Sequence, residues 1–240
     1  MTPAGTSRLG ILGRFLAPFG LIFVIVAVES SVMMALGRTA MQNARPVWSA
    51  AIIGTGTGLV ICLAVIAVLR VRGIGRFNWD VGQPSQLAWA ACLGLALGAA
   101  TTLLGAVVPG AMPDPVAGYS FMQIVALVMI GRSVYEELLF RGLLQGLLIP
   151  LLSRRWRFFS HDLSLAAVVG AVAFGLIHFS LLSLGGDFSP VSVIVVAGFL
   201  LGLLAGYYRD RTGSMVHPIV VHMCANLGGY FAGIVLASLA

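Results

Sequence analysis

The sequence predicts an all-α, polytopic transmembrane helical bundle, and two observations support this prediction. Hydrophobic residues make up 59% of the 240 residues, charged residues only 9%, and the mean hydropathy is +1.02. A soluble domain carries about 25% charged residues, so this chain has too little charge to cover a globular surface. Runs of mostly apolar residues, close to the about 20 needed to cross a bilayer, recur along the chain. We treat residues 1–240 as a single transmembrane domain.

The apolar runs number about seven, and stretches rich in Gly, Pro and Arg separate them. They cover residues 15–36, 48–69, 86–108, 119–152, 163–183, 190–208 and 214–239. The alternative is eight spans, in which the last run is split and ends in a separate short helix. The first run follows two arginines, as a signal peptide does. It is long enough to span and lacks a small-residue cleavage site, so we expect an uncleaved first helix.

The fourth run, residues 119–152, is too long for one perpendicular span. As a straight helix its 34 residues would measure about 51 Å. The hydrocarbon core of a bilayer is only about 30 Å thick. We therefore expect this segment to be strongly tilted, broken near Gly131, or projecting from the membrane.

The arginines indicate the orientation of the bundle. All 14 basic residues are Arg, and most lie in short loops between apolar runs, which is typical of membrane topology signals rather than of nucleic-acid binding. With seven spans, ten of them fall on one side: Arg8, Arg14, Arg70, Arg72, Arg76, Arg154, Arg155, Arg157, Arg209 and Arg211. Only Arg38 and Arg45 fall on the other. The positive-inside rule then predicts a plasma or inner membrane protein with a cytoplasmic N-terminus and an outside C-terminus.

The three cysteines, Cys62, Cys92 and Cys224, all fall inside apolar runs and form no CxxC motif. This pattern argues against a disulfide framework and against a thiolate zinc site. We expect them to be small buried residues.

Ionisable residues inside a membrane are costly, so each one is a candidate functional residue. Within the apolar runs they are Glu29, Arg132, Glu136, Glu137, Arg141, His178 and His222, with Asn226 as a polar companion. Glu29 stands alone in the first run, and we interpret it as a helix-packing or interfacial residue.

The fourth run carries two adjacent glutamates with different surroundings. Glu137 and Arg141 are four residues apart, so they share a helix face in the order that favours an ion pair. Glu136 points about 100° away and lacks this partner. A carboxylate without an ion-pair partner in an apolar environment is the better general base near neutral pH. A rival pairing of Arg132 with Glu136 is also four apart, and two such intrahelical pairs would have a purely structural role.

Two further runs carry histidines at helical spacing from a second motif residue. Phe174 and His178 share one face, as do His222 and Asn226. A lone histidine in an apolar helix also fits a hydrogen-bonded packing role. Glu136 and His178 lie at similar distances from the arginine-rich ends of their runs, and His222 lies somewhat nearer that end. A glutamate, two histidines and an asparagine that converge inside a bundle can activate a water molecule and stabilise an oxyanion.

The ordered combination of motifs is more specific than any one of them. EExxxR at Glu136–Arg141, FxxxH at Phe174–His178 and HxxxN at His222–Asn226 each occupy a separate apolar run. In this combination the sequence resembles the CAAX-protease and bacteriocin-processing family (CPBP, also called Abi), the glutamic intramembrane proteases. The resemblance covers a motif-bearing core of about residues 119–230.

The resemblance implies a role for each motif residue. Glu136 and His178 would activate the hydrolytic water, and His222 and Asn226 would stabilise the oxyanion. Glu137, Arg141 and Phe174 would support the site. The reaction would need no cofactor, and the partners would be the lipid bilayer and a hydrophobic or membrane-tethered peptide cleaved near its C-terminus.

Three alternatives stay open at this point. Two histidines and one glutamate can bind zinc and leave a position for water, although the sequence lacks HExxH and Arg141 is close by. A peptide-binding or bacteriocin-immunity protein would sequester a peptide without cleaving it. A transporter is a third class, but the chain shows no repeated half and no matching pair of broken helices.

Overall fold

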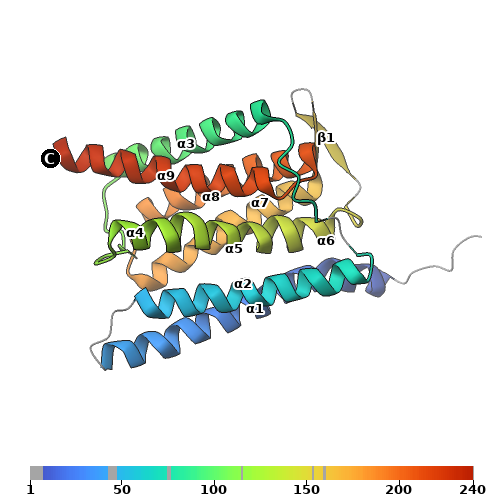
Figure 1. Ribbon diagram of the computed structural model, residues 1–240, viewed down its shortest axis with the longest axis horizontal. Coiled ribbons are helices and arrows are strands. Elements are labelled where there is room, and N and C mark those ends of the chain that lie inside the picture. Colours follow the sequence, from blue (N-terminus) through green and yellow to red (C-terminus); the bar gives the residue numbers. More distant parts are fainter. Residues whose placement is uncertain are drawn as a thin grey trace, which may run out of the picture.

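The computed structural model describes residues 8–42, 48–74, 77–114, 116–152, 154–158 and 161–239, and most of these residues are helical (Figure 1). The prediction of an all-α polytopic bundle is confirmed. Among the described residues, six helices are long and apolar enough to cross a membrane. The remaining predicted run, the fourth (residues 119–152), is also helical and carries the two glutamates.

The helices follow the predicted runs closely. Six runs form α1 (Arg8–Gln42), α2 (Trp48–Val71), α3 (Pro84–Val107), α7 (Leu165–Ile177) with the 3-10 helix η3 (His178–Leu184), α8 (Phe188–Thr212) and α9 (Val216–Leu239). The fourth run consists of α4 (Phe121–Gln123), η1 (Ile124–Arg132), α5 (Ser133–Glu137), η2 (Leu138–Gln145) and α6 (Gly146–Leu148). We call residues 121–148 of this run the motif helix.

Two expectations about helix breaks are wrong. The last run is one uninterrupted helix, α9, so the eight-span alternative with a split last run does not hold. The motif helix does not break near Gly131, because its junction residues Arg132 and Ser133 keep right-handed helical dihedrals. The helix changes its hydrogen-bonding pattern instead, since η1 and η2 are π-helical. A π turn widens a helix without ending it.

A short antiparallel hairpin follows the motif helix, where the sequence predicts only a stretch that separates two apolar runs. Its strands β1 (Arg155–Phe158) and β2 (His161–Ser164) pair with Trp156 opposite Leu163. The dense arginines of this segment obscured the alternation of apolar and polar residues that would have indicated strands. Ser164 ends the hairpin and caps the next helix, because its hydroxyl accepts a hydrogen bond from the Ala167 amide.

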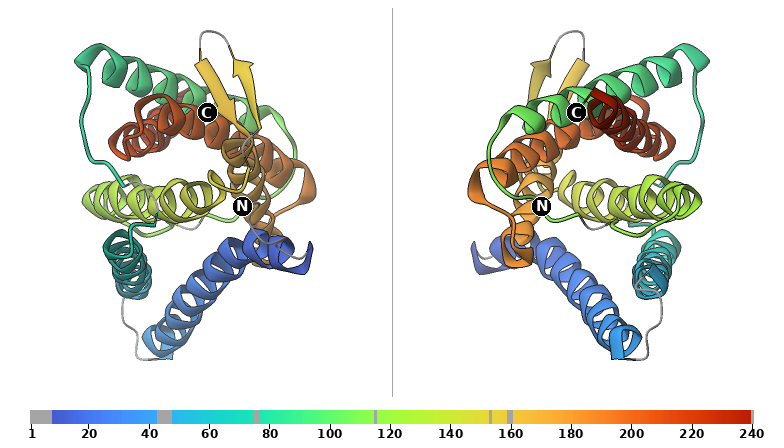
Figure 2. Two further views of the ribbon diagram at one scale, coloured as in Figure 1. Left: turned by 90° about the vertical axis from the view of Figure 1, so that its right-hand side faces the viewer. Right: turned by 90° about the vertical axis from the view of Figure 1, so that its left-hand side faces the viewer.

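The motif helix runs through the middle of the bundle. Figures 1 and 2 show it between the α1–α2 pair on one side and the α3–α9 pair on the other, with α7 and α8 beside it. Its apolar residues from Tyr135 to Leu148 supply seven of the sixteen buried residues of the main core cluster, and α1, α2, α7 and α9 supply most of the others. All eight residues of η2 are buried. This central position encloses Glu137 and Arg141 in protein, whereas the Arg132 side chain is 37% exposed.

The described arginine groups gather at one end of the bundle. The start of α1, the end of α2, the hairpin and the end of α8 lie at the same end in Figure 1, whereas α1 ends and α2 begins at the opposite end. Arg45 and Arg76 lie outside the described residues. Of the three free cysteines, Cys62 is buried and Cys224 is partly buried, but Cys92 is exposed, contrary to the expectation that all three are buried.

Glycines let α3 and α9 approach at backbone distance. A side-chain carbon added at Gly98 would collide with the backbone carbonyl of Ala225, and one added at Gly228 would collide with that of Leu95. Small residues at such positions allow close helix packing in membranes. The contact matters for the site because α9 carries His222 and Asn226.

We predict that Gly98→Ala and Gly228→Ala each lower the thermal unfolding midpoint in detergent, because overpacking a close contact costs about 1–3 kcal/mol. Gly105→Ala in α3 and Gly233→Ala in α9 are matched controls, since a side-chain carbon there meets no atom within 4 Å. The controls should be neutral or stabilising, because Ala favours a helix by up to about 1 kcal/mol over Gly. Equal effects at all four positions would contradict a close α3–α9 contact.

Candidate active site

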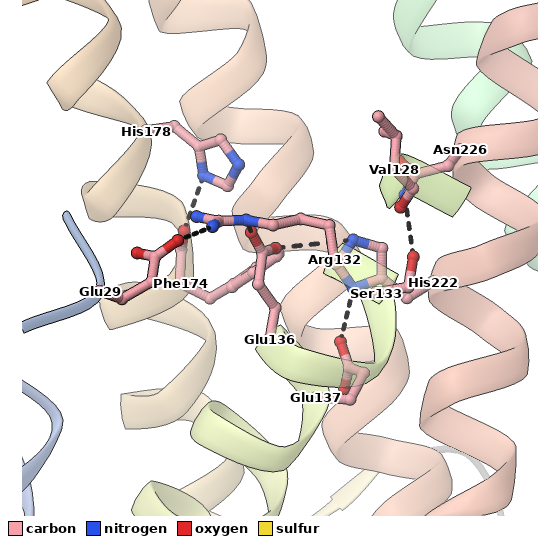
Figure 3. Close-up of polar contacts among 10 residues, drawn as sticks. All are labelled: Glu29, Val128, Arg132, Ser133, Glu136, Glu137, Phe174, His178, His222 and Asn226. Carbon is pink, nitrogen blue, oxygen red and sulfur yellow. Dashed lines mark hydrogen bonds and ion pairs between the residues drawn. The ribbon is translucent and has the colours of Figure 1, made fainter. Parts of the chain in front are cut away.

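The adjacent glutamates lie in the short α-helical stretch α5, which has a π-helical stretch on either side. π turns inside helices are frequent at functional sites. Figure 3 shows the two carboxylates pointing to different partners, Glu136 towards Arg132 and Glu137 towards His222.

Glu137 is the most enclosed charged group of the site. It has no exposed surface, and its Oε1 lies 3.0 Å from the Arg141 guanidinium and 2.8 Å from Nδ1 of His222. The predicted pairing of Glu137 with Arg141 is confirmed. A buried carboxylate is stable only when it is paired and hydrogen-bonded. Glu137 therefore fixes both the motif helix and the His222 ring of α9.

Glu136 is not the unpaired carboxylate that the helix spacing suggested. Arg132 donates from Nε to its Oε1 at 2.5 Å, so both intrahelical pairs form. The other oxygen, Oε2, makes no hydrogen bond with the described residues and lies 3.7 Å from Nε2 of His222. One oxygen of Glu136 is thus held by an arginine, and the other remains available to a further donor.

Glu29 is not an isolated packing residue, because it completes the same ion-pair chain. Its carboxylate is almost fully buried and accepts from Nη1 of Arg132 at 2.7 Å. Arg132 therefore bridges Glu29 of α1 and Glu136 of the motif helix (Figure 3). These ion pairs join the N-terminal half of the protein, which carries no recognised motif, to the candidate site.

His178 lies where α7 passes into η3, and its Nδ1 is 2.8 Å from the carbonyl oxygen of Phe174. A carbonyl only accepts, so Nδ1 carries the proton of this bond, and Nε2 is the basic nitrogen of the neutral ring. The Phe174 ring packs edge-on against the His178 and His222 rings, at centroid distances of 5.2 and 5.5 Å. The Arg141 guanidinium stacks 4.6 Å from the Phe174 centroid. Phe174 thus spaces the two histidines and covers the buried ion pair.

Asn226 lies one helical turn beyond His222 on α9. Its Nδ2 donates to the Ser133 hydroxyl at 2.9 Å and lies 3.5 Å from the Val128 carbonyl oxygen. Ser133 is fully buried and is not among the residues predicted from the sequence. It lies three residues before Glu136, and residues three apart share a helix face, so this spacing could have indicated that Ser133 belongs to the site.

Four of the predicted residues share one cavity of about 250 Å³. Phe174, His178, His222 and Asn226 line it, with Thr101 and Thr102 of α3 and Gly198 of α8 on the facing walls. Glu136 is not among the lining residues, and the shortest contact that joins it to them is the approach to His222. Helices α3, α7 with η3, α8 and α9 therefore line one space, whereas the motif helix contributes no lining residue to it.

No three His, Cys, Asp or Glu side chains are grouped as metal ligands in the described part of the chain. Of the set expected for a zinc variant, Glu136 is bonded to Arg132, and His222 is bonded to Glu137. A guanidinium beside the carboxylate repels a metal cation. The arrangement does not fit a three-ligand zinc centre.

The resemblance that the motifs indicated is confirmed over part of the chain by comparison with known proteins. A family model described as type II CAAX prenyl endopeptidase, Rce1-like, matches residues 118–228, slightly under half of the chain. The matched segment contains all three motifs, whereas α1 to α3 lie outside it. No curated protein and no solved structure matches the chain.

We predict that Glu137→Gln is more destabilising than Glu136→Gln in thermal unfolding of the detergent-purified protein. The first change leaves Arg141 as a buried charge without its counter-ion, which costs about 3–5 kcal/mol. The second leaves Arg132 paired with Glu29. If both changes destabilise equally, the two glutamates share one structural role, and the division between them is wrong.

Proposed function

Because residues 118–228 match the family model described as type II CAAX prenyl endopeptidase, Rce1-like, we propose that the chain is a glutamate-dependent intramembrane endopeptidase. Its substrate is a hydrophobic or membrane-tethered peptide, cut near its C-terminus. The observation that carries the proposal is the Oε2 atom of Glu136, which no described residue binds and which lies beside His222 of the shared cavity.

In the proposed reaction a water molecule attacks the scissile carbonyl directly. Glu136 accepts one proton from the water as its oxygen bonds to the carbonyl carbon, and Nε2 of His178 accepts a hydrogen bond from the proton that remains. A tetrahedral intermediate with an oxyanion results. The carbon–nitrogen bond then breaks, and the proton returns to the leaving amine. No serine or cysteine with a base beside it was found in the sequence, so no covalent enzyme intermediate is proposed.

His222 and Asn226 are proposed to stabilise the oxyanion. Nδ1 of His222 donates to Glu137, so in the imidazolium form Nε2 is the second donor and points to the side of Glu136. The Asn226 amide lines the same cavity, and the N–H that faces the Val128 carbonyl oxygen at 3.5 Å would turn to the oxyanion while the other keeps its bond to Ser133. Donors fixed in advance around a developing negative charge are typically among the largest contributions to catalysis.

Glu29 and Arg132 are proposed as positioning residues for Glu136. Arg132 holds one oxygen of Glu136 and is itself held by Glu29. Arg132 therefore orients the Glu136 carboxylate directly, and Glu29 orients it through Arg132. Such support keeps a reacting group in productive geometry. Glu137 and Arg141 orient His222 in the same way.

We also propose that the arginine-rich end faces the cytoplasm of a plasma or inner membrane. The positive-inside rule supports this orientation, because the described arginine groups gather at that end (Figure 1). The N-terminus is then cytoplasmic, and the C-terminus lies outside.

We predict that Glu136→Gln lowers cleavage of apolar and lipidated C-terminal fluorogenic peptides by about 10²–10⁴-fold, the usual contribution of a general base. The measurement is the initial rate in detergent, with and without a chelator, and wild-type activity should survive the chelator. Asp114→Asn, a matched change in the loop before the motif helix, should keep wild-type activity.

Two outcomes contradict the proposal. Loss of wild-type cleavage with chelator would support the zinc variant. Binding of these peptides without cleavage, by wild type and Glu136→Gln of equal thermal stability, would support a peptide-binding or immunity role.

We predict that Arg132→Gln lowers kcat by up to about 100-fold, the cost of misplacing a reacting group by about 1 Å, and leaves KM nearly unchanged. Arg132→Lys keeps the charge and should restore part of the lost kcat. Glu29→Gln should act in the same direction as Arg132→Gln. The check is steady-state kinetics of the three variants on one peptide. A rise in KM at constant kcat would instead place Arg132 in substrate binding.

A further inference from the structure

A second and larger cavity lies away from the candidate active site. It is a groove of about 940 Å³ between α3, α8 and the hairpin strand β2. Its walls are apolar and include Trp89, Leu93, Leu163, Leu200 and Leu204. It shares no lining residue with the cavity of His178 and His222. The proposed peptidase reaction does not use it.

The polar residues of the groove gather at one end. Gln83, Ser85 and Gln86 lie at the start of α3, and Arg211 lies in the last turn of α8. No carboxylate lines the groove. Arg211 is exposed, donates to the Tyr207 hydroxyl at 3.3 Å, and forms no ion pair with a described residue. The first turn of α3 adds the positive end of a helix dipole. We call this end of the groove the mouth; Arg211 is the charged residue that lines it, and the nearby Asp80 carboxylate, which accepts from the Gly82 amide, is not a lining residue.

A buried imidazole lies directly behind the mouth. His217 has no exposed surface, and neither of its ring nitrogens has a hydrogen-bond partner among the described residues. Its ring stacks on Tyr208, which lines the groove, with the planes 9° apart. It also approaches Gly82, where an added side-chain carbon would lie 3.1 Å from the ring. A buried polar group without a partner is costly, but His217 is not a lining residue of the groove, so this unused hydrogen-bonding capacity lies behind Tyr208 rather than within the groove.

The apolar walls and the positive charge of Arg211 indicate which class of ligand fits the groove. A peptide backbone would leave its amide groups unpaired against the apolar walls. Acyl chains need no such partners, and basic pockets between transmembrane helices at a cytoplasmic face bind anionic lipid head groups. We propose that this groove is a binding site for an anionic phospholipid, with its acyl chains along α3 and α8 and its head group at Arg211. The site is independent of the proposed peptidase function.

The test uses quenching of tryptophan fluorescence by lipids with brominated acyl chains. Replacing Trp48, Trp79 and Trp156 with Phe leaves Trp89 in the groove as the single tryptophan. The full chain is reconstituted in vesicles that mix phosphatidylglycerol and phosphatidylcholine, with one or the other brominated. We expect Trp89 to report about a fivefold preference for phosphatidylglycerol, the factor expected for one arginine near an anionic surface.

Variants of Arg211 and a control variant of Arg38 test whether the lipid preference depends on the polar end of the groove. Arg211→Gln should abolish it and Arg211→Lys should retain it, whereas Arg38→Gln at the opposite end of the bundle should change nothing. Equal thermal stability of the variants separates lost binding from misfolding. Equal quenching by the two lipids in the protein that retains Arg211 would overturn the proposal. An unchanged preference in Arg211→Gln would overturn the assignment of the head group to this end.

Discussion

The structure depends on the burial of Glu137. Its carboxylate has no exposed surface in a bundle with little other charge, and two groups from different helices satisfy one of its oxygens. Placing a charge in such surroundings is tolerated only with an opposite charge and hydrogen bonds in place. Arg141 supplies the charge from the next turn of the motif helix, and His222 ties that helix to α9. The glycine contact between α3 and α9 then completes the wall of the cavity.

The two adjacent glutamates illustrate how neighbouring identical residues acquire different environments. Glu137 points into protein on all sides, whereas Glu136 is 15% exposed at the side chain and keeps one oxygen without a hydrogen bond. The difference follows from the 100° turn between successive helical residues. One carboxylate is suited to hold the helices together, and the other is suited to chemistry.

The sequence alone predicted much of this arrangement, and its failures have physical causes. Apolar runs located the helices because a bilayer-spanning helix needs an unbroken apolar length. The spacing of four predicted Glu137–Arg141, since residues four apart share a face. The link from Arg132 to Glu29 joins residues 103 positions apart, and helical periodicity carries no information about contacts between helices. The π-helical stretches could not be predicted because tertiary packing, rather than local spacing, selects them, and the arginines of the hairpin segment mask its alternating pattern.

The ion-pair chain from Glu29 through Arg132 to Glu136 gives the N-terminal half a place in the site. Residues 118–228 match the family model, but the carboxylate that secures Arg132 lies in α1. A domain limited to the matched segment would lack this support. The candidate active site is therefore a property of the whole bundle rather than of the motif-bearing core alone.

The most direct measurement of the central claim is a single turnover in ¹⁸O-labelled water with hydroxylamine present. Direct attack by a water held at Glu136 predicts a product carboxylate that carries one ¹⁸O atom, with no hydroxamate and no enzyme adduct in the mass spectrum. A hydroxamate product or a covalently modified enzyme would show that a side chain attacks first, and that result would contradict the assignment of Glu136 as the base for water.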